Sequence, residues 1–334
     1  MERNYKMDTL RSIAILLIIM IHVSTYYVAN GFEKLDIDFW IGNIFASFSR
    51  IGVPIFILIS GHFLLGRHDS ILEFYKKRIR RIFVPIVFWS IFYSIYYPIG
   101  KYIIKNEWNI NIKIIFHNII LGKPFYHMWY LFMLVGLYLV TPIINKLCFK
   151  CGIEQINKIG FILLLCGLVL NIWNNYLGSD GPFILWFIPY LGYFILGYSL
   201  PKIKPINNYF LMSIYFLSCT STAILTYFTI IQFNNNLYFY HRLSPFIILG
   251  SLSIYLWFNQ ISINKNILSN FSKYTFGIYL THIGVLELIN YIEFKNGITG
   301  ITIIDILVKF FIVLIVSFVV VYTISRIPKL KRII

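Results

Sequence analysis

The chain is built from long apolar stretches that recur at short intervals. Each has roughly 20 mainly apolar residues, enough to cross a hydrocarbon core of about 30 Å. With 58% hydrophobic and only 13% charged residues, the chain has a composition that is too apolar for a soluble domain of 334 residues. We therefore predict an all-α fold, a polytopic membrane bundle of about ten transmembrane helices, at residues 10–29, 41–65, 79–102, 128–147, 159–176, 183–200, 209–232, 243–260, 276–292 and 301–324.

The distribution of Lys and Arg predicts which side each loop faces. If the ten spans alternate, 20 of the 29 Lys and Arg residues fall on the side of the N-terminus and 7 on the other side. Short cytoplasmic loops accumulate these residues, so both termini are expected in the cytoplasm. The net charge of +16 then faces anionic lipid of the bilayer, and it calls for no nucleic-acid partner. It also suits an anionic cytoplasmic substrate.

The chain contains no repeat, low-complexity linker or soluble appendage, which predicts a single integral membrane domain over residues 1–334. Its four cysteines do not form a disulfide pattern. Cys148 and Cys151 make one CxxC pair on a predicted cytoplasmic loop. A single pair is a weak metal signal, so we interpret the two as ordinary thiols and expect no metal site.

Ionisable residues inside the spans are the first functional candidates, because the membrane makes them costly. Arg11 and His22 are eleven residues apart, which places them within about 20° around a helix and about 16 Å along it. They therefore share a face, and Asp8 is spaced to pair with Arg11. The simpler interpretations are an interfacial anchor for Arg11 and a hydrogen-bonded neutral imidazole for His22. Arg50 lies well inside a span and should face a cavity or a partner.

A second candidate is the segment 76–81, which holds five cations in six residues just before an apolar run. Most such clusters only anchor a helix on the cytoplasmic side. Arg78 and Arg81, however, are spaced i, i+3, and their two guanidinium groups could hold phosphates in a way that lysines do not. This spacing indicates a phosphate-rich cytoplasmic ligand.

Short signatures elsewhere complete the pattern: "GVPIFILISG" at 52–61, "WYL" with Trp129 and Tyr130, and "GIYLTH" with Tyr279 and His282. Singly, such Trp and Tyr residues are most simply interfacial. In this order, together with Arg11, ten residues and His22, and with Arg78, two residues and Arg81, they resemble acyltransferase family 3, a family of ten-helix bacterial membrane O-acyltransferases. The resemblance covers nearly the whole chain.

The resemblance implies transfer of an acyl group, usually acetyl, from cytoplasmic acyl-CoA to a hydroxyl of a cell-envelope or exported glycan or a lipid-linked sugar. It implies acyl-CoA as co-substrate, no permanently bound cofactor, and a multi-pass location in the bacterial plasma membrane. Arg78 and Arg81 would bind the acyl-CoA phosphates, and His22, with Arg11, would be catalytic, either as a base or as a transient acyl carrier. Arg50 or His282 would polarise the thioester or orient the acceptor, with Trp129, Tyr130 and Tyr279 in support.

Family members with a fused esterase-like domain commonly carry a Glu a few residues after the Trp, whereas "WYLFMLVG" is apolar here, and no such domain follows "RIPKLKRII". We therefore expect the stand-alone subgroup. The alternative function is a transporter, flippase or polymerase of lipid-linked oligosaccharide, in which buried Arg and His line a path. The acceptor, the acyl chain, the membrane side of the acceptor and the oligomeric state stay open.

Overall fold

The computed structural model describes residues 3–105, 112–177, 183–233, 237–296 and 302–334. Within these ranges every regular element is helical, which confirms the predicted all-α class. Six short 3₁₀ turns lie at Phe183–Leu185, Ile188–Tyr190, Leu200–Lys202, Tyr238–Tyr240, Ser272–Tyr274 and Leu330–Ile333. The α-helices are α1 Tyr5–Asn30, α2 Ile37–Ser49, α3 Gly52–Leu64, α4 Ile71–Lys105, α5 Ile112–Ile120, α6 Trp129–Lys150, α7 Ile153–Leu177, α8 Leu191–Ser199, α9 Asn208–Gln232, α10 Pro245–Gln260, α11 Ile267–Phe271, α12 Thr275–Asn296 and α13 Thr302–Arg326.

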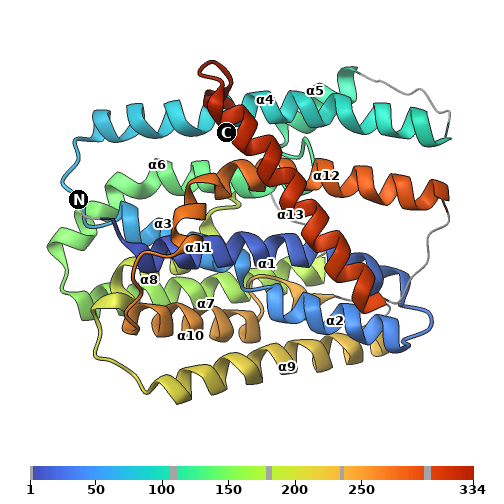
Figure 1. Ribbon diagram of the computed structural model, residues 1–334. Coiled ribbons are helices and arrows are strands. Elements are labelled where there is room, and N and C mark those ends of the chain that lie inside the picture. The colour runs from blue at the N-terminus through green and yellow to red at the C-terminus, as the bar shows by residue number, and fades with distance from the viewer. Residues whose placement is uncertain (1–2, 106–111, 178–182, 234–236, 297–301) are drawn as a thin grey trace.

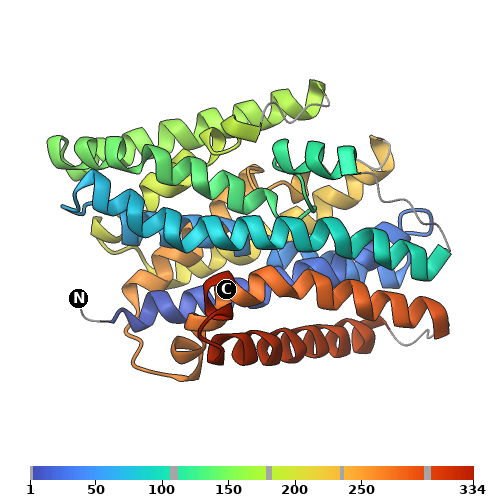
Figure 2. The same ribbon diagram turned by 90° about the horizontal axis from the view of Figure 1, so that it is seen from above.

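The long helices lie side by side with their axes roughly along one direction (Figure 1). α1 is central and packs against α2, α3, α11, α12 and α13. α4 and α5 cover one side of the bundle and α9 the opposite side (Figure 1). Seen from above, α7 and α13 form opposite edges (Figure 2). The helices that pack against α1 therefore enclose it within the bundle.

Seven described segments are long and apolar enough to cross a membrane: Tyr5–Asn30, Ile37–Leu64, Ile71–Gly100, Trp129–Lys150, Ile153–Leu177, Asn208–Gln232 and Thr302–Arg326. Their outward faces carry exposed large hydrophobic side chains, such as Phe88 on α4, Phe216 on α9 and Phe311 on α13. Apolar surface on this scale is unstable in water and is satisfied by lipid. The chain is a multi-pass membrane protein.

Of the other three predicted spans, one is a short helix, one lies within a 22-residue helix and one is broken. Residues 243–260 correspond to α10, which has 16 residues, and residues 276–292 lie within α12. Residues 183–200 are not one continuous helix, because two 3₁₀ turns precede α8 and Pro189 lacks the N–H that an α-helix needs. A Cβ on Gly167 of α7 would overlap the carbonyl oxygen of Pro189, so this segment lies tightly against α7. Residue 301, where the last predicted span begins, lies outside the described residues.

The second predicted span, 41–65, is formed by two helices. α2 ends at Ser49, α3 begins at Gly52, and Arg50 lies at the junction. A Cβ on Gly52 would lie 3.0 Å from the carbonyl oxygen of Ala14, so α3 starts in close contact with α1. Arg50 therefore lies at a break between helices and not in the middle of one.

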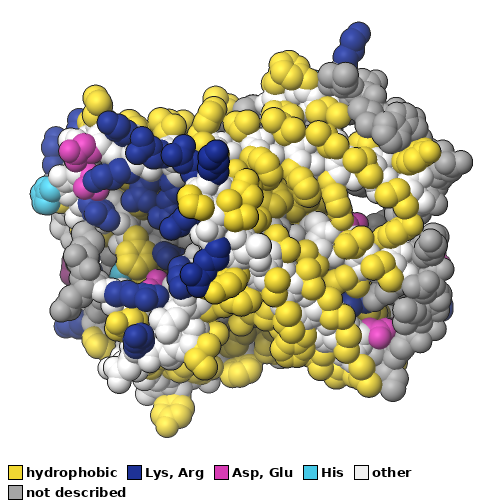
Figure 3. Space-filling model, turned by 45° about the horizontal axis from the view of Figure 1, so that its top comes forward, with side chains coloured by type: hydrophobic (Ala, Val, Ile, Leu, Met, Phe, Trp, Pro, Cys, Tyr) yellow, Lys and Arg dark blue, Asp and Glu magenta, His cyan; other side chains and the backbone are white. Residues whose placement is uncertain are grey.

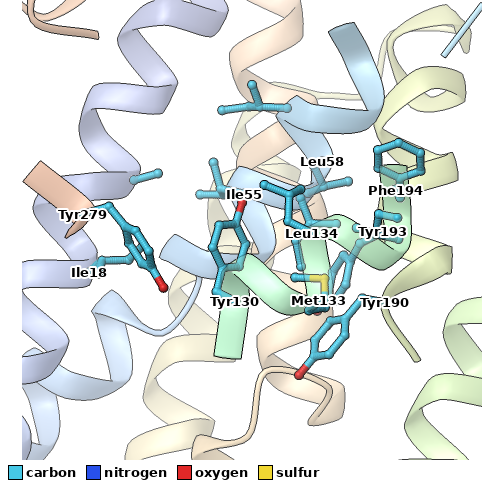
Figure 4. Close-up of a cluster of buried hydrophobic side chains, with 14 of the residues drawn as sticks. Ile18, Ile55, Leu58, Tyr130, Met133, Leu134, Tyr190, Tyr193, Phe194 and Tyr279 are labelled. Atoms are coloured by element: carbon cyan, nitrogen blue, oxygen red, sulfur yellow. The ribbon is translucent and has the colours of Figure 1, made fainter. Parts of the chain in front are cut away.

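The core joins α3, α6 and α8, with Met133 and Leu134 of α6 lying near Leu58, Tyr193 and Phe194 (Figure 4). α3 and α8 approach each other through two glycines. A Cβ on Gly61 would overlap the carbonyl oxygen of Phe194, and a Cβ on Gly197 would overlap that of Leu58. Small residues allow membrane helices to pack backbone against backbone. The two glycines thus set the distance between α3 and α8.

Candidate active site

Three histidines meet where α1, α12 and the entry to α6 come together. The His22 ring centroid lies 5.3 Å from that of His282, which lies 5.6 Å from that of His127. His127 and His282 are buried, whereas His22 is only partly buried. Within the described part of the chain, no hydrogen bond reaches the His22 ring. The simpler interpretation of His22, an imidazole held by a neighbouring helix, therefore finds no support among these residues.

The hydrogen bonds of His282 indicate which of its ring nitrogens carries the hydrogen. Its Nδ1 lies 2.7 Å from the carbonyl oxygen of Tyr279 and 3.1 Å from that of Ile278. Because carbonyl oxygens only accept, Nδ1 must donate. Nε2 is then the free acceptor of the neutral ring, and it is buried with no partner among the described residues.

Tyrosines and a carboxylate surround the histidine cluster. The Tyr126 ring lies 5.6 Å from that of His22, and its hydroxyl donates to Oε1 of Glu287 at 3.3 Å. The hydroxyl of Tyr279 donates to the backbone carbonyl of His127, and the Tyr130 ring packs 5.4 Å from Tyr279. Sequence reasoning overlooked Glu287, although an acidic residue inside the predicted span 276–292 is a signal that would have found it.

The arginines of the two sequence motifs come together at one end of the bundle. Arg11 pairs with Asp8 at 3.6 Å, as its spacing predicts. The charges of Arg11, Arg78 and Arg81 all act on the hydroxyl of Tyr138 on α6. Lys and Arg side chains gather over this end of the molecule, and hydrophobic side chains cover most of the middle of the face in view (Figure 3).

Arg78 and Arg81 do not have equivalent surroundings. Arg81 is exposed, whereas Arg78 is partly buried, with its guanidinium carbon 5.5 Å from the Phe74 ring centroid and 5.9 Å from that of Tyr138. The Nε of Arg78 is buried and has no hydrogen-bond partner among the described residues. The Arg78 side chain is thus held against aromatic rings, while its Nε–H lacks a hydrogen-bond acceptor among the described residues.

Arg50 lies near the histidine cluster, at the junction of α2 and α3. Its Nη2 donates to Oγ1 of Thr25 at 3.2 Å, and its guanidinium carbon lies 4.0 Å from the Tyr240 ring centroid. No carboxylate of the described residues pairs with it, its Nε has no partner there, and its charge acts on His22. Arg50 therefore brings an uncompensated positive charge close to His22.

A cavity of about 880 Å³ opens beside the histidine cluster, and Arg11, Arg78 and Arg81 are not part of its described wall. Its walls include Tyr126, Trp129, Asn171, Trp186 and Arg242. Trp129 lies nine residues before Tyr138, so about 14 Å of α6 separates the cavity from the arginine end. Tyr126 both lines the cavity and contacts His22. The irregular segment around Pro189 forms part of the wall, which explains how a broken helix is tolerated there.

Some cavity residues carried no signal in the sequence. Arg242 lies with its guanidinium carbon 4.0 Å from the Trp129 ring centroid, although 113 positions separate the two residues. His62 of α3, which does not line the cavity, was also overlooked. Its Nδ1 is 3.2 Å from the Tyr255 hydroxyl and its Nε2 is 3.4 Å from Nδ2 of Asn4. Neither contact could be inferred from spacing along the chain.

The fold and this site define a multi-pass helical membrane protein with a histidine cluster between a basic end and a cavity. Residues 4–326 match acyltransferase family 3, described as an acyltransferase domain, so the chain belongs to this family, as its motifs indicate. It is 27% identical over 192 residues to O-acetyltransferase OatA of Staphylococcus aureus (strain NCTC 8325 / PS 47), covering 52% of this chain and 30% of that protein.

A second relative is an amino-acid racemase of Enterococcus faecalis, 28% identical over 127 residues, which cover 37% of this chain and 18% of that protein. The chain thus spans less than a third of the length of the curated relatives it matches. No solved structure matches it.

Proposed function

We propose that this protein transfers an acyl group, most simply acetyl, from acyl-CoA to a hydroxyl of a cell-envelope or exported glycan or a lipid-linked sugar. The observation that supports this proposal best is the position of His22. It is partly accessible, free of hydrogen bonds from the described residues, and located between a basic end and a cavity. A donor and an acceptor can therefore approach it from opposite directions.

The proposed topology has ten spans with both termini in the cytoplasm of a bacterial cell. The connections 65–70, 151–152, 203–207 and 261–266 lie at the end where Lys and Arg gather (Figures 1 and 3). Cytoplasmic loops are the ones rich in these residues. The arginine end then faces the cytoplasm, where acyl-CoA is made, and the cavity faces outward.

Donor binding is assigned to Arg78, Arg81 and Arg11. CoA carries several phosphate charges, and guanidinium groups recognise phosphate oxygens through paired, charge-assisted hydrogen bonds. The buried Nε of Arg78 has a hydrogen to donate and no partner among the described residues. With the phosphates at this end, the pantetheine arm is long enough to carry the thioester inward toward His22.

In the chemical step, His22 accepts the proton of the acceptor hydroxyl as the oxygen attacks the thioester carbonyl. The charge of Arg50 stabilises the oxyanion of the tetrahedral intermediate, because no carboxylate of the described residues neutralises that charge. When the carbon–sulfur bond breaks, the CoA sulfur leaves with the proton from the His22 imidazolium. His282, with Nε2 free as an acceptor, orients the acceptor.

The test is release of CoA thiol by the purified protein in lipid nanodiscs, with acetyl-CoA and isolated cell-envelope glycans. The His22→Ala variant should release none, whereas His117→Ala, which removes an exposed histidine of α5, should behave as wild type. No release by the wild type, or equal release by His22→Ala, would overturn the enzyme assignment. Movement of a lipid-linked sugar without thiol release would favour the transporter or flippase.

Direct transfer and an acyl-histidine intermediate are separated by a second measurement. Labelled acetyl-CoA is mixed with the protein in the absence of acceptor, and the protein is precipitated. Label that stays with the wild-type protein and is absent from His22→Ala identifies a covalent intermediate. Absence of label from both identifies direct transfer.

A further inference from the structure

The described wall of the cavity carries two cations. They are Lys123 and Arg242, and no Asp or Glu belongs to the part of the wall that the structure describes. His241, in the connection before α10, adds no charge near neutral pH, because burial, followed by the charges of Arg242 and Arg50, lowers its pKa to about 3. Glu287 of α12 does not line the described wall, and it accepts the hydroxyl of Tyr126. The charge of Arg242 is therefore not balanced by any carboxylate of the described wall.

The two cations are held by aromatic rings. The guanidinium carbon of Arg242 lies 4.0 Å from the Trp129 ring centroid, and Nζ of Lys123 lies 5.4 Å from that of Trp186. The backbone of Arg242 is fixed as well, because its carbonyl accepts the Tyr193 hydroxyl at 2.8 Å. Its guanidinium forms no ion pair with a described residue. A planar group with five N–H donors is thus positioned at the wall of the cavity.

The remaining wall combines amides with flat apolar surfaces. Asn171, Asn174 and Asn175 of α7 line one side, and the rings of Trp186 and Tyr190 line another. Nδ2 of Asn171 is buried and has no hydrogen-bond partner among the described residues. The Asn171 side chain also has a hydrogen bond with Tyr238, and a buried N–H left without an acceptor is costly unless a ligand supplies one. Amides both donate to and accept from hydroxyls, and rings pack against the C–H faces of a saccharide.

The size of the cavity fits a small oligosaccharide. Its volume of about 880 Å³ lies in the range of sites that enclose a small organic ligand. We propose that the cavity binds an acidic saccharide, whose carboxylate or phosphate pairs with Arg242 while its hydroxyls bond to the asparagines. That this ligand is the acyl acceptor rests on the proposed function, since Tyr126 joins the cavity to His22.

Binding to the purified full-length protein in phosphatidylcholine nanodiscs tests the charge requirement. The probes are cellobiouronic acid and its neutral counterpart cellobiose, measured by calorimetry. The acid should bind roughly 10- to 150-fold more tightly, as expected for hydrogen bonds to a charged group. Arg242→Gln should remove this preference and Arg242→Lys should keep part of it, whereas Lys34→Gln, which removes an exposed charge that does not line the cavity, should keep all of it.

A second pair, glucose 6-phosphate and glucose, distinguishes phosphate from carboxylate as the anionic group. Equal affinity within both pairs, or a preference that survives in Arg242→Gln, would overturn the inference. Inorganic phosphate that binds as tightly as glucose 6-phosphate would overturn its saccharide part.

Thiol release from acetyl-CoA, measured with the same sugars, separates this inference from the proposed function. A charge preference in binding without thiol release from any acceptor would refute acyl transfer and leave the binding site in place. Thiol release that is equally fast with acidic and neutral acceptors, with no charge preference in binding, would refute the acidic saccharide and leave acyl transfer in place.

Discussion

Replacing Arg78 by Gln should weaken binding of CoA far more than replacing either neighbouring arginine. Arg78 is partly buried against Phe74 and Tyr138, and its Nε has no partner among the described residues. A hydrogen bond from such a group to a phosphate contributes about 1.5 to 3 kcal/mol, which corresponds to roughly 10- to 150-fold in affinity. Arg81 is exposed, so its loss should cost only about 0.2 to 1 kcal/mol, or roughly 1.4- to 5-fold.

The assay is calorimetric titration of CoA into each variant in nanodiscs, with Arg80→Gln as the matched control. Arg80 is an exposed arginine of the same helix, so its variant removes the same charge from a different face. If thiol release is also followed, Arg78→Gln should raise KM and leave kcat nearly unchanged, because the phosphates are bound alike before and during transfer. If Arg78→Gln and Arg80→Gln bound CoA with equal affinity, the specific role of Arg78 would be refuted. Non-specific attraction between the basic end and the CoA phosphates would then explain all the binding.

Three further outcomes are expected. Gly61→Ala should lower the free energy of unfolding by about 1 to 3 kcal/mol, because the new methyl overlaps the backbone of α8, whereas Gly152→Ala, which meets open space, should not; thermal unfolding of the two variants checks this. Tyr279→Phe should cost about 1 to 3 kcal/mol by leaving the buried His127 carbonyl unpaired, and exposed Tyr176→Phe is its control in the same measurement. Affinity for cellobiouronic acid should be constant from about pH 5 to pH 8, because the low pKa of His241 keeps its ring neutral there; tighter binding as the pH falls through 6.5 would contradict this.

The hydropathy of the chain predicts its helices because lipid requires every backbone group in a span to be bonded within its own helix. This rule locates the seven long membrane-crossing segments of the described residues well. It fails at residues 183–200, where Pro189 and the contact with Gly167 divide the helix and the turns line a cavity. That contact depends on α7, which hydropathy does not take into account.

Spacing along the chain predicts the pairing of Arg11 with Asp8, because both lie on one helix. It also singles out His22, Arg78 and Arg81, although their roles stay predictions. It gives no indication of the stacking of Arg242 on Trp129 or of the meeting of His22 with His282. Those contacts join helices that are far apart in sequence, and only the packed bundle brings them together.

The glycine contact between α3 and α8 has a consequence for the order in which the protein is assembled during synthesis. Gly61 and Gly197 are 136 positions apart, so at about 5 to 20 residues per second the ribosome needs roughly 7 to 27 s to supply the second helix after the first. During this interval α4, α6 and α7 enter the membrane while the groove at Gly61 still faces lipid or the insertion machinery. The centre of the bundle therefore closes late, and helices inserted earlier must leave room for α8 to reach it.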